Sequence, residues 1–332
     1  MRTKPKSIVT IGGGSGQYTL LSGLRDLPGI NLTAIVSMAD SGGSTGILRG
    51  ELGALPAGDV LKCILAMSPM RDVAHELLLK RFSKSERLRN HNAGNMLLTM
   101  LSEYAGSFPE GIQALAEILN VRGSILPVTT DKVTLVAELA NGQRVFGEAA
   151  IDVPRHLQRA NISSVFLVPH HGEDVTVHLP VIDAIINADI ILLGPGDLYT
   201  SIIPNLLVEG LAEALNFAKA KKYFVSNIMT KFGETQGYRL EGYVNSVERY
   251  MGSKLDGILY NSARPSDEAL KRYAAQHAEF VDVGNMAQLK QRLDVRTVPL
   301  LDETGGVVRH SGAALGTAIQ QLIAELDTKM AG

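Results

Sequence analysis

An apolar strand that runs directly into a cluster of glycines constrains the fold of this chain more than any other feature. Residues 8–11 are largely β-branched, which is typical of a buried parallel strand. The glycine-rich turn that follows consists of Gly12, Gly13, Gly14, Ser15 and Gly16. Leucines then recur at helical spacing until Pro28-Gly29. In such a strand–glycine–helix unit, backbone N–H groups and a helix N-terminus face one point, which attracts phosphate. A tight turn that needs glycine only for its dihedral angles remains the alternative.

The glycine turn does not match two familiar nucleotide-binding motifs. Gln17 and Thr19 stand where the two possible registers of G-x-G-x-x-G would need their last glycine, which argues against a routine NAD-dependent dehydrogenase. The chain also contains no G-x-x-x-x-G-K-[ST] sequence, so a Walker-type ATPase is disfavoured.

Composition excludes several other classes. Lys+Arg is 32 and Asp+Glu is 34, a net charge of −2, so no basic excess suggests nucleic-acid binding. No apolar run is long enough to cross a bilayer, and no signal peptide precedes the first strand, so we expect no membrane insertion and a cytoplasmic location. The single cysteine, Cys63, lies in an apolar helical pattern, which predicts a buried structural thiol.

Strand-like and helix-like segments alternate along the chain. This alternation predicts one α/β domain over residues 1–332, with a Rossmann-like, mostly parallel sheet and helices on both faces. Further strands are expected at Leu32–Val36, Val165–Val168, Ile190–Leu193, Tyr223–Val225, Gly257–Tyr260 and Phe280–Val283. Helices are expected between them, for example at Leu206–Ala220, Asp267–His277 and Ala313–Leu326.

Two regions depart from the alternation and are interpreted as insertions. Residues 57–120 are almost wholly helical in pattern, and we predict a helical insertion there. Residues 124–153 alternate as strands about Asn141-Gly142, a strong hairpin signal, and we predict a β-hairpin.

Polar and glycine-rich clusters follow several strands, where open parallel sheets bind their ligands. Asp40 and Ser44 come after the second strand, and Asp40 suits a ribose hydroxyl or a metal ion. Asp59 opens a helix after Pro56, where it is either a functional acid or a local cap.

Three further clusters complete a predicted ligand groove. His91 and Asn95 lie in a polar loop that could contact the polar edge of a substrate. Another strand–glycine–helix junction carries Gly194, Gly196, Thr200 and Ser201, and the strand after it ends at Asn227. These groups would supply amide and hydroxyl donors to one ligand.

Together these motifs resemble the YvcK-type gluconeogenesis factors, within the superfamily of CofD, the 2-phospho-L-lactate transferase. The resemblance covers nearly the whole chain and rests on residues 11–16, 39–44, 55–59, 91–95, 120–123, 193–207, 227–235 and 308–310. It implies a Rossmann-like core, a cytoplasmic location, binding of UDP-sugars such as UDP-N-acetylglucosamine, and a role in cell-wall homeostasis and cell shape during gluconeogenic growth.

The resemblance also implies particular residue roles. Tyr273 and Arg309 match a tyrosine and an arginine that contribute to UDP-sugar binding, and Asp59 matches an aspartate that contacts the deazaflavin substrate in CofD. Two departures stand out: Asp40-Ser41 replaces two successive acids, and Asp197 replaces a serine. The stretch after Phe82 matches the deazaflavin enzyme poorly, which favours the regulatory branch.

Four interpretations of function follow, the last of which is a scaffold with a vestigial site. The first is a nucleotide-sugar binding protein without established turnover, with the diphosphate on the Gly12–Gly16 turn. The second is a CofD-like transferase that moves a phospho-lactyl group to an acceptor hydroxyl, with Mg²⁺ held by Asp40 and Asp59 and His91 as a base. The third is an NAD-binding Rossmann protein. We also expect a homo-oligomer, a dimer.

Overall fold

A fully parallel sheet forms the centre of the protein, whose computed structural model describes residues 4–83, 88, 91–154 and 159–331. The sheet has seven strands in the order β10-β9-β8-β7-β1-β2-β3. Its strands are β1 (Lys6–Gly12), β2 (Ile30–Val36), β3 (Ser124–Pro127), β7 (Ile190–Leu193), β8 (Lys221–Val225), β9 (Gly257–Asn261) and β10 (Asp294–Val298). The inner strands are apolar and buried, because helices cover both faces of such a sheet. The predicted α/β class with a Rossmann-like sheet is confirmed.

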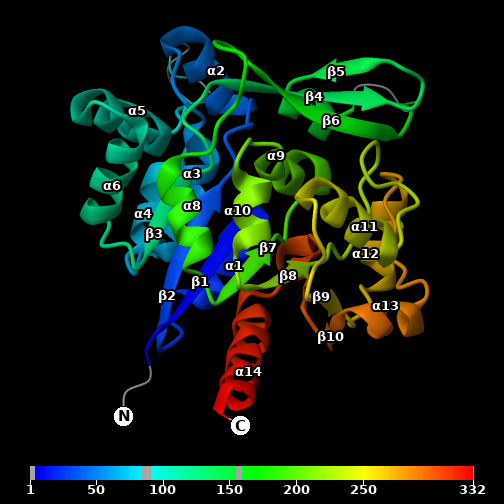
Figure 1. Ribbon diagram of the computed structural model, residues 1–332. Coiled ribbons are helices and arrows are strands. Elements are labelled where there is room, and N and C mark those ends of the chain that lie inside the picture. The colour runs from blue at the N-terminus through cyan, green and yellow to red at the C-terminus, as the bar shows by residue number, and fades with distance from the viewer. Residues whose placement is uncertain (1–3, 84–87, 89–90, 155–158, 332) are drawn as a thin grey trace.

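The order of the strands reverses at β1. The chain first adds β2 and β3 on one side of β1, and then returns to place β7 and the later strands on the other side. Because parallel crossovers are right-handed, this reversal puts two sets of helices on opposite faces. α1 (Gly14–Leu24) packs against α3 (Ala57–Met67) and α14 (Gly312–Ala331), and α8 (Leu179–Ile186) packs against α10 (Leu211–Phe217) (Figure 1).

The helical region between β2 and β3 begins with α2 (Gly43–Leu52) and α3 and continues through α4 (Arg71–Leu79), α5 (Ala93–Ala105) and α6 (Phe108–Ile118). α3 packs against β2, β3 and α1, so it is a crossover helix of the main sheet and not part of an insertion. Cys63 on α3 is fully buried, as predicted. Of the stretch after Phe82, residues 84–87 and 89–90 lie outside the described residues.

A small antiparallel sheet adjoins the main one. β4 (Val133–Leu139) and β5 (Arg144–Phe146) form the predicted hairpin around Asn141-Gly142. Two details of the prediction are wrong. Residues 124–127 form β3 of the main sheet. The strand expected at Val165–Val168 is β6 (Ile162–Pro169), which pairs antiparallel with β4, and the half-exposed pattern of β6 suits such a one-sided sheet.

Other boundaries differ from the prediction for local reasons. Phe280–Val283 is not a strand, because Phe280 makes only an isolated bridge with Met229. The expected helix over Leu206–Ala220 is interrupted at Gly210, whose φ is 91°.

The remaining elements are α7 (Glu148–Asp152), η1 (Leu198–Ile202), α9 (Ile203–Leu206), α11 (Leu240–Met251), α12 (Asp267–Ala274), α13 (Met286–Arg292), β11 (Leu301–Asp302), η2 (Thr304–Gly306) and β12 (Arg309–His310).

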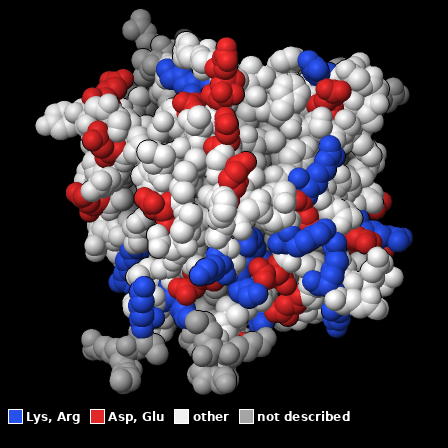
Figure 2. All heavy atoms as spheres, in the orientation of Figure 1, with Lys and Arg blue, Asp and Glu red and all other residues white. Residues whose placement is uncertain are grey.

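The surface bears charges of both signs. On the face in Figure 2, acidic side chains are more frequent above, and Lys and Arg gather along the lower edge with acids among them.

None of the helices in the described ranges combines the length and the apolar character that crossing a membrane requires.

Candidate functional site

Four of the predicted polar clusters lie side by side at one edge of the main sheet. β8, β7, β1 and β2 are neighbours, and their carboxyl ends meet where the strand order reverses. A cavity of about 820 Å³ opens there. Parallel α/β sheets bind their ligands at this topological switch point.

The N-terminus of α1 forms the floor of this cavity, which we call the cleft. Gly13, Gly14, Ser15 and Gly16 line it, and no side chain caps the helix. Glycine is required by space at one position and by conformation at another: a Cβ on Gly16 would come 2.3 Å from the Pro195 carbonyl oxygen, and Gly14 has a φ of 67°. The N–H groups of this first turn therefore point toward a space that an anion can enter.

The junction after β7 forms a second side of the cleft. Gly196 and Ser201 line the cleft, and the carbonyl of Gly196 accepts a hydrogen bond of 2.9 Å from Asn227 Nδ2. Gly194 and Thr200 do not line the cleft. The N–H of Gly194 donates to the carbonyl of Ile11, and the Thr200 hydroxyl donates to Glu234 at 3.4 Å.

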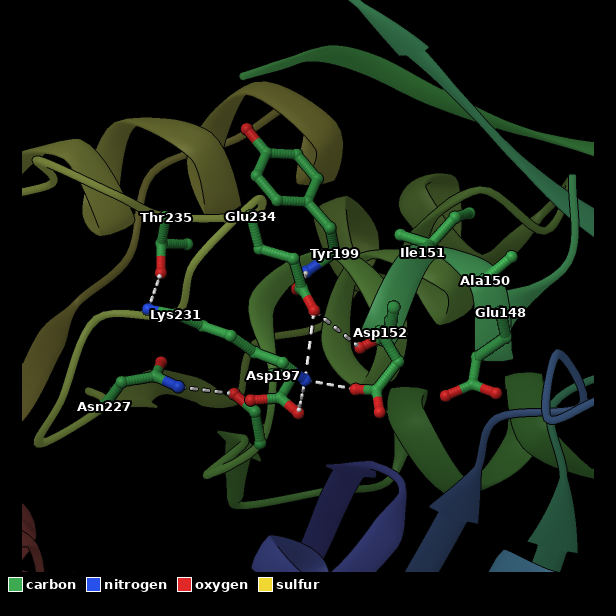
Figure 3. A network of polar contacts seen from close by, with 12 residues as sticks. Glu148, Ala150, Ile151, Asp152, Asp197, Tyr199, Asn227, Lys231, Glu234 and Thr235 are labelled. Atoms are coloured by element: carbon green, nitrogen blue, oxygen red, sulfur yellow. Dashed lines mark hydrogen bonds and ion pairs between the residues drawn. The ribbon is translucent and has the colours of Figure 1, made fainter. Parts of the chain in front are cut away.

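A lysine surrounded by three carboxylates forms the adjoining wall (Figure 3). Lys231 Nζ lies 2.7 Å from Asp197 Oδ2 and 3.2 Å from Glu234 Oε1, and it also pairs with Asp152 Oδ1. The Glu234 side chain is fully buried and accepts the N–H of Tyr199 at the start of η1. Burial raises the pKa of Glu234 to about 7, and the charges of Asp197 and Asp152 act in the same direction, whereas Lys231 opposes them.

Acids from the β2 side face the cleft from the opposite direction. Burial raises the pKa of Asp40 above its ordinary value, and the negative charge of Asp59 raises it further. Asp59 lies in the first turn of α3 and accepts a 2.9 Å bond from Lys62 Nζ, so it is not the N-cap of that helix. Burial also raises the pKa of Glu148 to about 8, with Asp40 and Asp152 adding to the effect. Three carboxyl groups thus share a region in which Lys62 and Arg49 supply positive charge.

The β11–β12 hairpin brings Arg309 to the cleft. Tyr273 on α12 also lines it, and its hydroxyl accepts the N–H of Val308, which holds the hairpin beside α12. His310 Nε2 lies 3.0 Å from the carbonyl of Ser226, so this nitrogen carries the proton. Burial lowers the pKa of His310 to about 4, so the ring is neutral at neutral pH and offers Nδ1 as an acceptor.

The structure brings most, but not all, of the predicted site residues together. The predicted residues that line the cleft are Gly13, Gly14, Ser15, Gly16, Asp40, Asp59, Gly196, Ser201, Asn227, Tyr273 and Arg309. Those that do not line it are Gly12, Ser44, His91, Asn95, Gly194 and Thr200. Ser44 and His91 are buried together, with Oγ 3.2 Å from Nδ1, so His91 has no direct route to a ligand in the cleft.

Several cleft residues were not predicted as ligand-binding positions. They are Lys62, Glu148, Asp152, Lys231 and His310. The only feature of the sequence that indicated Lys231 as a site residue is the polar character of residues 227–235. Glu148 and Asp152 come from α7, which follows the small sheet, and no local pattern connects α7 to the glycine turn.

The chain is similar over nearly its whole length to one group of known proteins. The family model described as 2-phospho-L-lactate transferase CofD matches residues 8–301. A Bacillus subtilis protein named gluconeogenesis factor is 38% identical over 327 residues, covering 98% of this chain and 100% of that protein. A protein of the same name from Halalkalibacterium halodurans is 37% identical over 319 residues, covering 95% and 96%. A crystal structure of a Bacillus halodurans protein superimposes with a TM-score of 0.89 at 36% identity, covering 96% of this chain and 100% of that one.

Proposed function

The chain belongs to the CofD family, and from this premise we propose that its cleft binds a nucleotide-sugar through the diphosphate, with UDP-sugars such as UDP-N-acetylglucosamine as the ligands. The observation that carries the proposal is the uncapped N-terminus of α1, which opens into the cleft at the switch point of the sheet. Gly13 and Gly14 leave the backbone accessible to a phosphate. The volume of about 820 Å³ is ample for a ligand of this size.

Groups suited to the rest of the nucleotide lie beside the phosphate site. The guanidinium of Arg309 can bind phosphate oxygens in a bidentate manner. Tyr273 offers an aromatic surface, and His310 Nδ1 and Asn227 offer polar contacts to a ribose or a base. These groups support a nucleoside diphosphate over a simple anion.

Charge in the cleft supports a role for a divalent cation. The cleft is lined by five acids and three bases, namely Asp40, Asp59, Glu148, Asp152 and Asp197 with Lys62, Lys231 and Arg309. Glu148 is largely protonated at neutral pH, since its pKa is about 8, and the remaining acids outnumber the bases by one, so a divalent cation would favour binding of a diphosphate. Asp40 and Asp59 fit Mg²⁺, because two close carboxylates destabilise each other until a cation neutralises them, and oxygen ligands are those that Mg²⁺ prefers. A bound ion would neutralise part of the diphosphate charge.

A CofD-like transferase is the second candidate, which the match to the CofD family model favours. Transfer to an acceptor hydroxyl would need a base within reach of that hydroxyl. His91 is 5% exposed and lies outside the cleft, so it does not fit this role. Asp59 and Glu148 line the cleft instead and are the acids placed to act as such a base, so a test of turnover separates the two candidates.

The names of the relatives support a physiological role. Proteins named gluconeogenesis factor match 95–98% of the chain at 37–38% identity. We accordingly propose a role in gluconeogenic growth, in which binding of a UDP-sugar connects metabolism with cell-wall homeostasis and cell shape.

Thermal unfolding with a set of nucleotides tests this proposal. A ligand that binds only the folded state raises the melting temperature as its concentration exceeds the dissociation constant. UDP-N-acetylglucosamine, GDP and NAD are compared, each with Mg²⁺ and with a chelator. We expect the largest rise with UDP-N-acetylglucosamine and Mg²⁺. A rise with NAD alone would instead support the dinucleotide-binding interpretation.

A further inference from the structure

The wall opposite Asp40 and Asp59 contains a group of acids that already surrounds a cation. Oxygen atoms of Asp152, Asp197 and Glu234 all lie within 4.8 Å of one another, a spacing that suits the ligands of a metal ion. The ammonium of Lys231 contacts all three carboxylates (Figure 3). Because an ammonium has three N–H donors, these contacts can use its whole donor capacity.

The three acids come from separate parts of the fold. Asp152 ends α7, Asp197 precedes η1, and Glu234 follows β8. Like charges at such distances repel strongly unless a cation lies between them. Lys231 therefore does here what a metal ion does in a carboxylate site: it holds three segments together by neutralising their charges.

The two walls of the cleft differ in this respect. Lys62 binds Asp59 from one side. The carboxylate of Asp40 accepts the N–H of Gly42 at 2.9 Å and the hydroxyl of Thr45, and Arg49 donates to its backbone carbonyl. The Lys231 wall carries its own cation in the middle of the acids. Lys231, Asp152 and Asp197 also line the cleft, so this fixed positive charge faces the space that the ligand would enter.

We propose that Lys231 is a built-in cation of the cleft, which occupies the position that a second divalent ion would take and reduces the negative charge that this wall presents to the diphosphate of the ligand. The last part rests on the proposed function. The cleft then uses one divalent ion, at Asp40 and Asp59, and one lysine where a two-metal site would use two ions.

Counting bound Mn²⁺ tests the proposal without any nucleotide. Titration of the full chain, followed by electron paramagnetic resonance of free Mn²⁺, gives the number of ions per chain. We expect one ion for the unaltered protein and two for Lys231→Met, because the three carboxylates become available. The second ion should disappear again in Lys231→Met combined with Asp197→Asn.

A matched variant controls for the loss of a lysine as such. Lys221 pairs with the single carboxylate of Asp256 at 2.7 Å, so Lys221→Met should bind no additional Mn²⁺. An unchanged ion count in Lys231→Met, or two ions in the unaltered protein, would overturn the proposal. If no ion binds at Asp40 and Asp59, the metal part of the proposed function fails, while a gain of one ion in Lys231→Met still supports the role of Lys231.

Stability and affinity provide two further readouts. Lys231→Met leaves three close carboxylates without their cation, so it should melt earlier than the unaltered protein, and Mn²⁺ should restore more of its melting temperature. Its affinity for UDP-N-acetylglucosamine should fall about tenfold, because the wall beside the diphosphate becomes more negative. A melting temperature that Mn²⁺ leaves unchanged would contradict the assignment even if the variant is poorly stable.

Discussion

Two carboxylates decide, at the scale of single residues, whether the cleft takes a metal ion. Asp40 is buried near Asp59, and burial and that neighbouring charge disfavour its ionised form. Asp59 pairs with Lys62 and lies in the first turn of α3, where a carboxylate interacts favourably with the helix dipole. The two acids therefore differ in what they contribute to stability, although both line the cleft.

Removing each charge separates stability from function. Asp40→Asn should unfold at the same or a higher temperature, because the repulsion is relieved, but it should lose Mg²⁺-dependent affinity for a UDP-sugar. Asp59→Asn should lose affinity and also about 0.3–1 kcal/mol of stability, because it removes a charge from the start of a helix. The measurements are thermal melts and calorimetric titrations with Mg²⁺ and with a chelator. Full affinity in both variants under both conditions would exclude the metal site.

Arg309 provides a second test at this scale. It is exposed on β12, so Arg309→Ala should change the free energy of unfolding by less than about 0.5 kcal/mol. Its affinity for the nucleotide-sugar should fall about tenfold, and Arg309→Lys should also weaken binding, since an ammonium cannot form the bidentate contact. Arg144→Ala, on the hairpin away from the cleft, is the matched control. Equal titration curves for all these proteins would remove Arg309 from the site.

The buried carboxyl of Glu234 predicts a pH dependence of stability. Its pKa is about 7 in the folded protein against an ordinary value of 4.5, so the folded state binds the proton more tightly than the unfolded state. This group contributes stability that is fully present below pH 4.5 and is lost as the pH rises through 7. Denaturant titrations across this range should show a steeper decline for the unaltered protein than for Glu234→Gln, which cannot ionise. Parallel curves would show that Glu234 does not titrate in this way.

At the scale of elements, the cleft depends on the way in which α1 begins. Its first turn has a glycine at positive φ, and the helix packs so closely on the junction after β7 that a Cβ on Gly16 would come 2.3 Å from the Pro195 carbonyl oxygen. The strand, the glycine turn and the helix could be predicted because their signals are local. The same holds for the Asn141-Gly142 hairpin.

Pairing between distant segments could not be predicted in the same way. β6 and the strands of the main sheet are similar apolar runs, and the partner of each depends on tertiary packing. β10 lies at the edge of the sheet and three of its five residues are polar, so it gave no strong signal. Glu148 and Asp152 could not be predicted as site residues for the same reason, since only the packing of α7 brings them to the cleft.

Two glycines with nearly the same backbone test the role of the α1 N-terminus. Gly14 has a φ of 67° and lines the cleft, whereas Gly29 has a φ of 73° and lies in open space away from it. Alanine at either position should cost roughly 1–2 kcal/mol, because both require a left-handed conformation. Only Gly14→Ala should also weaken binding of the UDP-sugar, since its Cβ obstructs the approach of phosphate. Equal affinities in the two variants would mean that the phosphate lies elsewhere.

At the scale of the whole molecule, the reversal of strand order at β1 makes the cleft. It places the ends of four neighbouring strands, the start of α1, the junction after β7 and the β11–β12 hairpin around one cavity. Segments from both halves of the chain thus contribute to one site. A ligand that binds there must touch both halves at once.

Hydrogen exchange of backbone amides, with and without UDP-N-acetylglucosamine and Mg²⁺, tests whether the cleft binds the nucleotide-sugar. We expect the ligand to slow exchange in residues 13–17 and 196–201 and in the hairpin around Arg309, and a chelator to abolish most of this protection. A second cavity lies at the opposite edge of the sheet, lined by Arg25, Arg122 and neighbouring residues, and its amides should be unaffected. A ligand that binds but leaves residues 13–17 unprotected, or that protects only the second cavity, would show that the ligand does not bind in the cleft.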